Sequence, residues 1–205
     1  MNDVRRRHLL LVTCLSCIGM LGMPTLPANG KERDTRPGIA PEVVASYLHA
    51  IIEADRTIYS KYIVNRLQKK GIVSVHEAWE QNNALPLPAQ FLQKSGRLVA
   101  DKGTGIRFRL ISLWPIYERN GPATNFERKG LEQVSQVPDT PYSGIIRSGK
   151  MKFYQALYAD KAVTKACVTC HNKHPLSPKR DFKLNDVMGA IVITIPLPEE
   201  KKGKQ

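Results

Sequence analysis

Cysteine is scarce in this sequence, with only four residues among 205. Cys14 and Cys17 lie within an apolar N-terminal segment, and the other two, Cys167 and Cys170, are separated by two residues. If the N-terminal segment is removed, both remaining thiols belong to one motif, so no structural disulfide is expected. The sequence also lacks internal repeats, and beyond residue 30 it lacks an apolar run long enough to span a membrane.

The N-terminal segment has the pattern of an export signal. Arg5–Arg7 form a charged region, Leu9–Met23 form an apolar region, and residues 24–30 could contain a cleavage site. The apolar region is short for a membrane span. We therefore expect residues 1–30 to be a signal peptide and the protein to be periplasmic, with an uncleaved N-terminal anchor as the alternative.

The two remaining cysteines belong to the run Cys167-Val168-Thr169-Cys170-His171, which is the attachment signature of a c-type haem. On a single helical turn, two intervening residues let both sulfurs reach the same edge of a porphyrin, and His171 then follows as the proximal iron ligand. The alternatives are a disulfide or structural thiol pair and a zinc site formed by Cys167, Cys170 and His174. No second cysteine pair supports the zinc site, so we expect one covalent haem c.

Acidic residues are outnumbered, 18 against 31 basic ones, which gives a formal net charge of +13. Loss of residues 1–30 would lower this charge to +11, and haem propionates would lower it further. A basic surface favours acidic protein partners or anionic lipid headgroups. Nucleic acid is not an expected partner of an exported haem protein.

The hydrophobic pattern changes along the chain from a helical period to an alternating one. Pro41 is expected to open a long helix that runs to about Lys70 and ends at Gly71. The further helices that we expect are a short one from Ser74 through Trp79, one from Pro88 to about Ala100, one from the Thr124 capping box to Gln136, and a short one from about Ala162 that carries the haem motif. The expected strands are Ile106–Leu110, a hairpin of Tyr142–Arg147 and Met151–Tyr158, and Gly189–Ile195.

These elements predict an α+β fold, in which an antiparallel sheet is combined with a long N-terminal helix. Removing residues 1–30 leaves about 175 residues, which suits one domain. We expect residues 31–40 to be a flexible leader, residues 41–197 to form the haem domain and residues 198–205 to be a basic tail. Only 34 residues follow His171, whereas a small single-haem cytochrome c carries its motif near the N-terminus.

Several ordered stretches resemble the PAS-like c-type haem domain family of bacterial sensors. They are Ile52–Arg56, Ala84–Phe91, Leu110–Pro115, Ala166–Pro175, and Ser177–Lys179 with Asp186–Gly189. The resemblance spans roughly residues 40–197. It implies a PAS-like fold with one covalent haem c and a role in redox or ligand sensing. Some relatives are fused to signalling modules, and this chain carries none, so its output would pass through a partner.

The sixth iron ligand is open at this stage. Some members of the resembled family are believed to use a cysteine, but no cysteine lies outside the motif once residues 1–30 are removed. The other donors are His49, His76, His174, Met151, Met188, Tyr59 and Tyr62. We favour His49, at the border of the apolar face of the long helix, or Met188, near the last strand. The competing interpretations are a surface histidine, a core methionine, and an open or water-bound site.

Other side chains are candidates for the haem pocket. Arg56 and Arg109 could pair with propionates, although an ordinary solvated face is the alternative for both. Tyr59 and Tyr62 lie on the stripe of the long helix, where packing is the simpler interpretation. His174 is too close to His171 in sequence to reach the opposite haem face without a sharp turn, so we expect it near the proximal ligand or a propionate.

Together these patterns predict a periplasmic mono-haem c protein that acts as a sensor of redox state or of a small ligand such as a diatomic gas. The alternative is a soluble electron-transfer cytochrome that docks to acidic redox partners. An enzyme such as a peroxidase is the least expected function, because no distal His/Arg pairing is evident. Membrane association is expected only through an uncleaved N-terminal segment.

Overall fold

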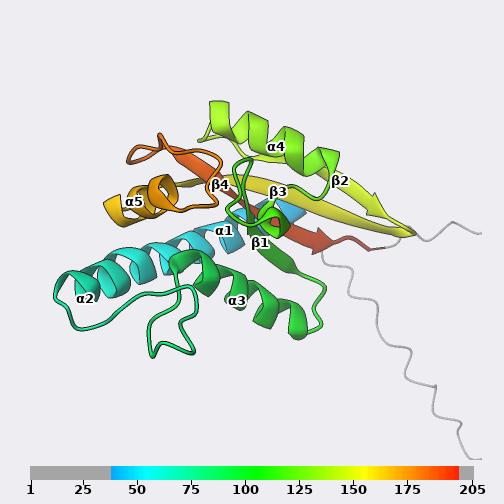
Figure 1. The fold of residues 1–205 in the computed structure, drawn as a ribbon. Helices are drawn as coiled ribbons and strands as arrows, with labels where there is room; N and C mark the ends of the chain where they lie inside the picture. Colours follow the sequence, from blue (N-terminus) through cyan, green and yellow to red (C-terminus); the bar gives the residue numbers. More distant parts are fainter. Residues whose placement is uncertain (1–37, 199–205) are drawn as a thin grey trace, which may run out of the picture. The chain divides into compact units, whose positions relative to one another are not determined.

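The computed structural model describes residues 38–198, and these form four antiparallel strands with helices on both faces of the sheet (Figure 1). The strands are β1 (Arg107–Ile111), β2 (Tyr142–Ser148), β3 (Met151–Lys161) and β4 (Val187–Pro196), in the spatial order β1-β4-β3-β2. The α+β fold with an antiparallel sheet is therefore confirmed. No helix within residues 38–198 has the length and apolar character needed to cross a membrane.

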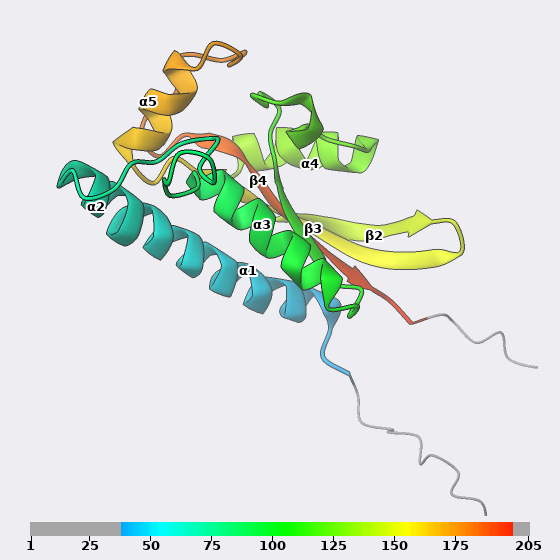
Figure 2. The same ribbon diagram turned by 60° about the horizontal axis from the view of Figure 1, so that its bottom comes forward.

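The central strands β3 and β4 carry apolar side chains on both faces because both faces are covered. Helices α1 (Pro41–Thr57) and α3 (Pro88–Asp101) cover one face, while α4 (Asn125–Gln136) covers the other (Figure 1, Figure 2). Ala156 and Ile193 are paired in the register and face α1 and α3, whereas their neighbours Leu157 and Val192 face α4. This alternation follows from the two-residue period of a strand.

The long N-terminal helix is present as predicted, but it is not a uniform α-helix. After α1 it continues as a π-helical segment, η1 (Ile58–Val64), and then as α2 (Asn65–Lys69). Pro41 stands in its first turn, and Gly71, with φ of 66°, follows its end, as the sequence indicated. The sequence analysis did not predict the π segment.

The remaining boundaries agree with the sequence to within a few residues, with one exception. The expected short helix from Ser74 through Trp79 is wrong, because this stretch forms a bridge and turns. The His76 ring accepts the backbone N–H of Ala78 at 3.0 Å. In a helix this N–H would bond to a backbone carbonyl, so the side chain competes with helix formation. A short 3-10 turn, η2 (Glu118–Asn120), and the helix α5 (Lys165–Lys173) complete the fold.

Gly96 permits the close packing of α3 on β1. A Cβ atom at this position would collide with the carbonyl oxygen of Phe108, which is backbone and cannot rotate away. We expect Gly96→Ala to lower the free energy of unfolding by about 1–3 kcal/mol. Urea denaturation checks this value, with Gly38→Ala as the control because no atom lies near the position of its Cβ. A variant as stable as the parent chain would contradict the close approach.

Candidate functional site

The Cys-x-x-Cys-His motif lies on one short helix, α5, that follows the end of β3. Thr164 caps this helix, since its hydroxyl accepts the Cys167 backbone N–H at 3.4 Å and also lies 3.2 Å from the Cys167 sulfur. Cys167 and Cys170 are free thiols, and His171 follows on the same helix. The placement of all three side chains on one helix agrees with the sequence prediction.

A long loop after α5 returns to the sheet and is fixed to the motif helix. The Asn172 side chain donates to the Phe182 carbonyl at 2.9 Å and accepts the Phe182 N–H at 3.0 Å. The Phe182 ring stands edge-on to the His171 ring, with 5.9 Å between centroids. Phe182 also packs with Met188 and Ala162 in a small apolar cluster that includes Cys167. The loop thus holds the His171 ring and encloses one side of the motif.

A cavity of about 330 Å³ lies beside α5 and contacts Cys167, Cys170 and His171 together. The α1–α2 helix supplies Arg56, Ser60, Val64 and Gln68, while β4 supplies Met188 and Gly189; the other walls come from α3, β1 and the loop after it, which includes Trp114 and Tyr117. The cavity therefore combines aromatic and apolar walls with many polar and charged side chains.

The π segment explains how one helix contributes four side chains to the cavity. Arg56, Ser60, Val64 and Gln68 are spaced by four residues, and in an α-helix each such step would rotate the side chain by about 40° around the axis. The wider turn of η1 reduces this drift, so Ser60 and Val64 both remain buried on the cavity side. Single π turns in α-helices are frequent at functional sites.

Three buried polar atoms on the cavity wall have no hydrogen-bond partner: Arg56 Nε, Ser60 Oγ and His171 Nδ1. An unpartnered buried polar group costs about 1–3 kcal/mol, and such groups are uncommon in native proteins. Their occurrence around one cavity is accounted for if a polar or ionic group normally occupies it. The residues present thus fit a bound cofactor that carries acceptor groups.

Arg56 and Asp160 form a buried ion pair on the same wall. Arg56 Nη2 lies 2.9 Å from Asp160 Oδ2, and both side chains are 8 % exposed. Burial raises the pKa of the Asp160 carboxyl, the Arg56 guanidinium opposes this shift, and the Glu53 carboxylate adds to it. The sequence analysis identified Arg56 but missed Asp160, which lies on β3.

The surroundings of His171 favour the neutral form of its imidazole, which is the form that can ligate a metal. Burial lowers the pKa of His171, and the neighbouring His174 and Arg56 lower it further. His174 itself is directed away, with Nε2 3.3 Å from Glu77 Oε1 and Nδ1 accepting the Leu176 N–H at 3.1 Å. Glu77 in turn accepts the Tyr117 hydroxyl at 2.7 Å. His174 therefore lies near the site as an anchored neighbour.

The two favoured sixth ligands lie in different places. Met188 is buried, contacts the cavity and packs in the cluster that includes Cys167. His49 lies two turns before Arg56 on α1, is not among the residues of the cavity wall, and stacks on Tyr158 with 4.0 Å between ring centroids. This placement favours Met188 over His49 as the residue nearer to the motif.

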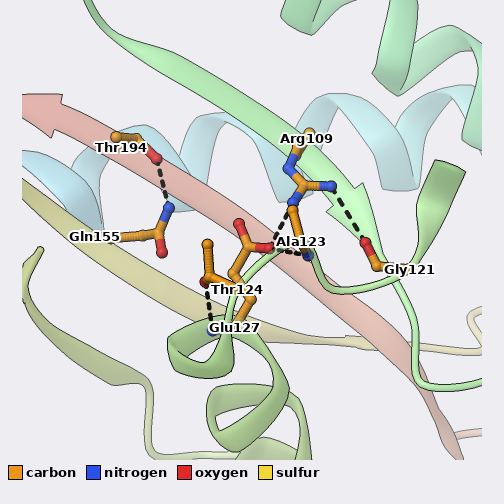
Figure 3. Close-up of polar contacts among 7 residues, drawn as sticks. All are labelled: Arg109, Gly121, Ala123, Thr124, Glu127, Gln155 and Thr194. Carbon is orange, nitrogen blue, oxygen red and sulfur yellow. Dashed lines mark hydrogen bonds and ion pairs between the residues drawn. The ribbon is translucent and has the colours of Figure 1, made fainter. Parts of the chain in front are cut away.

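The other predicted pocket residues lie away from the cavity. Tyr59 donates to the Pro86 carbonyl at 2.8 Å and stacks on Phe91, so it joins the long helix to α3, while Tyr62 is exposed. Arg109 faces α4, where its guanidinium lies 2.6 Å from Glu127 Oε2 and also donates to Gly121 (Figure 3). Contact between these three residues and a haem stays a prediction. It is not favoured, because Tyr59 and Arg109 have other hydrogen-bond partners and Tyr62 is exposed.

The environment of His49 predicts a dependence of stability on acid. Burial lowers the pKa of His49 and Glu53 only partly opposes this, while burial raises the pKa of its stacking partner Tyr158 to about 12. A depressed histidine pKa means that the unfolded chain binds the proton first, so stability is full above about pH 6.5 and is lost as the pH falls below it.

We therefore expect His49→Phe, which keeps the stack, to reduce the loss of unfolding free energy between about pH 7.5 and about pH 5. Urea denaturation at the two pH values measures it. His76→Phe is the control, because His76 is exposed. An undiminished acid dependence in the His49 variant would mean that other groups, such as His171, cause the whole effect.

The zinc alternative finds no support. Over residues 38–198, no three or more His, Cys, Asp and Glu side chains are grouped in a way that could hold a metal ion. In particular, His174 has its own partners, as described above, and does not join Cys167 and Cys170.

A second, more open cavity of about 940 Å³ also borders α5 and shares part of its wall with the first. Cys170 and Thr164 border both cavities, and three lysines, Lys61, Lys69 and Lys165, border the open one. Acidic side chains are absent from its described wall. The motif helix therefore borders both the first cavity and a more open groove lined by lysines.

Comparison with known proteins places these features in a family. The model of the Tll0287-like family matches residues 40–196. A solved structure of the cyanobacterial heme-protein Tll0287 is similar over 79 % of this chain and 99 % of that chain, with 16 % sequence identity and a TM-score of 0.47. No curated protein matches the chain.

Proposed function

The chain belongs to the Tll0287-like family, and from this premise we propose that it is an exported protein with one covalent haem c in a PAS-like domain, which senses redox state or a small ligand. The observation that carries the proposal is the cavity beside α5, where Cys167, Cys170 and His171 lie together with the unpartnered buried atoms Arg56 Nε and Ser60 Oγ. The solved family protein is described as a heme protein, which agrees with this assignment.

The residues would hold the group in distinct ways. Cys167 and Cys170 would form the two thioethers, and His171, kept neutral by its surroundings, would be the proximal ligand. Met188 is the candidate for a second protein ligand, and Arg56 with Ser60 would supply donors to acceptor groups of the cofactor. When bound, the haem supplies one-electron redox chemistry and a site for small ligands.

A sensing role is supported by how the cavity is built. Its wall includes four side chains of the α1–α2 helix, which also packs on the sheet and α3. A change of charge or ligand at the cavity would therefore act directly on Arg56, Ser60 and the π segment. π-helical turns are frequent at functional sites. A buried ion pair can be rearranged when a switching protein changes from one conformation to another.

The alternative function is electron transfer. The lysine-bordered groove beside Cys170 favours it, because an acidic redox protein could dock there close to one attachment site. Such docking would weaken steeply with salt. We expect no enzymatic turnover with peroxide from either function.

The optical spectrum of the purified protein tests the proposal. The protein is expressed with haem-maturation machinery. Its spectrum is measured in the oxidised state, after reduction with dithionite, and after CO is added to the reduced protein. Sharp reduced α and β bands without a CO shift would support a six-coordinate redox sensor or carrier, and a CO-shifted Soret band would support a ligand sensor. Absence of a Soret band would overturn the haem assignment.

Two further measurements separate these cases. In the six-coordinate case, Met188→Ala should open the site to CO while His49→Phe should not, if Met188 is the sixth ligand. A carrier should exchange electrons rapidly with acidic proteins in a salt-sensitive way. A sensor should instead change hydrogen exchange along the α1–α2 helix between oxidation states or on binding CO.

A further inference from the structure

The wall of the cavity of about 330 Å³ carries two arginines with different surroundings. Arg56 is buried, and its positive charge is balanced by the Asp160 carboxylate at 2.9 Å. Arg119, in η2, is exposed and forms no ion pair with a carboxylate of residues 38–198. No lysine borders this cavity within the part of the chain that the structure describes. Arg119 is therefore the arginine of this wall whose charge is left to act on a bound group.

Arg119 is held in place by a tyrosine that is itself fixed. Its guanidinium carbon lies 4.9 Å from the centroid of the Tyr117 ring, a distance at which a cation is attracted to the ring face. The Tyr117 hydroxyl donates to Glu77 at 2.7 Å, and the ring stands edge-on to His174 with 6.1 Å between centroids. Because Tyr117 and Arg119 both border the cavity, the stack fixes the cation at the cavity's exposed edge.

The position of Arg119 suits a propionate of the haem. A haem carries two propionate carboxylates on the edge of the ring opposite to the vinyl groups. Thioethers at Cys167 and Cys170 would place the vinyl edge at α5, so partners for the propionates must come from another wall, and η2 belongs to such a wall. Because Arg119 is exposed, a propionate that it binds would stay partly hydrated and would avoid the full cost of burying a carboxylate. A planar guanidinium also suits bidentate contact with a carboxylate.

The other charged side chains of this region do not suit a propionate as well. Arg109, which the sequence suggested as a propionate partner, is not on the cavity wall and lies 2.6 Å from Glu127 (Figure 3). Glu77 and Asp160 border the cavity, and each carboxylate would repel a propionate. Attraction and repulsion therefore favour the same position, next to Arg119.

We propose that Arg119 binds a propionate of the haem through its guanidinium while it stays stacked on Tyr117. The inference rests on the proposed function, because it requires the haem. It adds a cofactor-binding residue that the sequence analysis did not select. A propionate neutralised by Arg119 stabilises the more positive, oxidised iron less than a free propionate does, so Arg119 would raise the reduction potential.

Arg119→Gln in the haem-loaded protein tests the proposal. Loss of the cation should lower the reduction potential. At a fixed applied potential and low ionic strength, the ratio of oxidised to reduced protein should rise by roughly three- to tenfold. A tenfold change corresponds to about 59 mV for one electron. The resonance Raman band of propionate bending should also shift, because it responds to the hydrogen bonds of the propionate.

The matched control is Arg107→Gln on β1. Arg107 is also exposed, and its guanidinium carbon lies 5.6 Å from the centroid of the Phe153 ring, but it does not border the cavity. This variant should change the ratio by less than about twofold and leave the Raman band unchanged. Arg119→Lys keeps the charge and should keep most of the potential, while the band should shift because the bidentate contact is lost.

The outcomes separate this inference from the haem proposal. An unchanged potential and Raman band in Arg119→Gln, with haem attached, would overturn the inference and leave the haem proposal standing. An equal change in Arg107→Gln would also overturn it, because the effect would then come from overall charge. A fall in potential as large in Arg119→Lys as in Arg119→Gln would assign the effect to packing on Tyr117 and overturn it too. Absence of a Soret band in the parent protein would reject the haem proposal itself, and this inference with it.

Discussion

Replacing both Cys167 and Cys170 by serine should eliminate all haem that remains attached to the chain after denaturation. A thioether needs a sulfur nucleophile, and the serine hydroxyl does not take its place, so the effect should be all or none. Haem-stained denaturing gels and the pyridine haemochrome spectrum measure covalent attachment directly. The parent chain should stain, and the double variant should not.

The matched control is Thr169→Ser, which changes an exposed residue between the two cysteines and leaves both thiols in place. It should retain the full stain. A second variant, His171→Ala, should keep covalent haem but lose the parent's coordination spectrum, because both thiols remain while the proximal ligand is absent. Covalent haem in the double serine variant, or none in the parent, would contradict the assignment of the motif.

The helix of the Cys-x-x-Cys-His run and most of the other elements were predictable because their signals are local. The Cys-x-x-Cys-His run, the Pro41 start, the Gly71 stop and the Thr124 cap each act within one or two helical turns. Thr124, for example, does accept the Glu127 backbone N–H, at 3.2 Å. Periodicity likewise identified β3 and β4, since a strand buried on one or both faces has a distinct apolar pattern.

The parts that were missed depend on residues far apart in the chain. Arg56 and Asp160 are 104 positions apart, and nothing local in either segment indicates that they meet. The same holds for Arg109, which the sequence suggested for a propionate but which the fold directs to Glu127 on α4. A propensity-based argument also does not predict the π segment, in which Ser60 and Val64 are both buried by the tertiary structure.

One signal for the missed cavity residues was nevertheless present. The spacing is four residues between each of Arg56, Ser60, Val64 and Gln68. Residues spaced by exactly four do not stay on one face of a regular α-helix, which has 3.6 residues per turn. Ser60 within this series is a small polar residue between the buried residues Arg56 and Val64. A polar residue in such a position calls for a partner, which here would be a group held in the cavity.

Asp160→Ala should be the most destabilising single substitution at the site. It removes one member of a buried ion pair and leaves the Arg56 guanidinium buried without its carboxylate, which typically costs about 3–5 kcal/mol. The control is Asp139→Ala, which breaks the Asp139–Lys161 pair. Because Asp139 is 89 % exposed, its loss should cost less than about 1 kcal/mol. Urea denaturation at neutral pH compares the two variants.

The double variant Arg56→Leu/Asp160→Leu should recover much of the lost stability, because replacing a buried pair with apolar side chains is often neutral. Recovery would show that the cost of Asp160→Ala comes from the unpaired charge. If the double variant were no more stable than Asp160→Ala, packing or the cavity itself would account for the loss instead.

The pH dependence gives an independent check of the same pair. Burial raises the pKa of Asp160 in the folded chain above its ordinary value of 3.8. Between the pKa of the unfolded chain and that of the folded chain, Asp160 therefore keeps a proton in the folded chain that the unfolded chain has released. Ionisation of Asp160 therefore costs stability as the pH rises through the folded-state pKa, and the Arg56 guanidinium offsets part of this cost. Asp160→Asn cannot titrate and should lack this cost.

The same substitution reports on the cavity. In Asp160→Asn the Arg56 positive charge is no longer neutralised, and Arg56 is close enough to lower the pKa of His171. An uncompensated cation near the iron favours the reduced, less positive state, so the reduction potential should rise relative to the parent protein. An unchanged potential, with the stability effect present, would place the haem away from Arg56 and assign the ion pair to the fold alone.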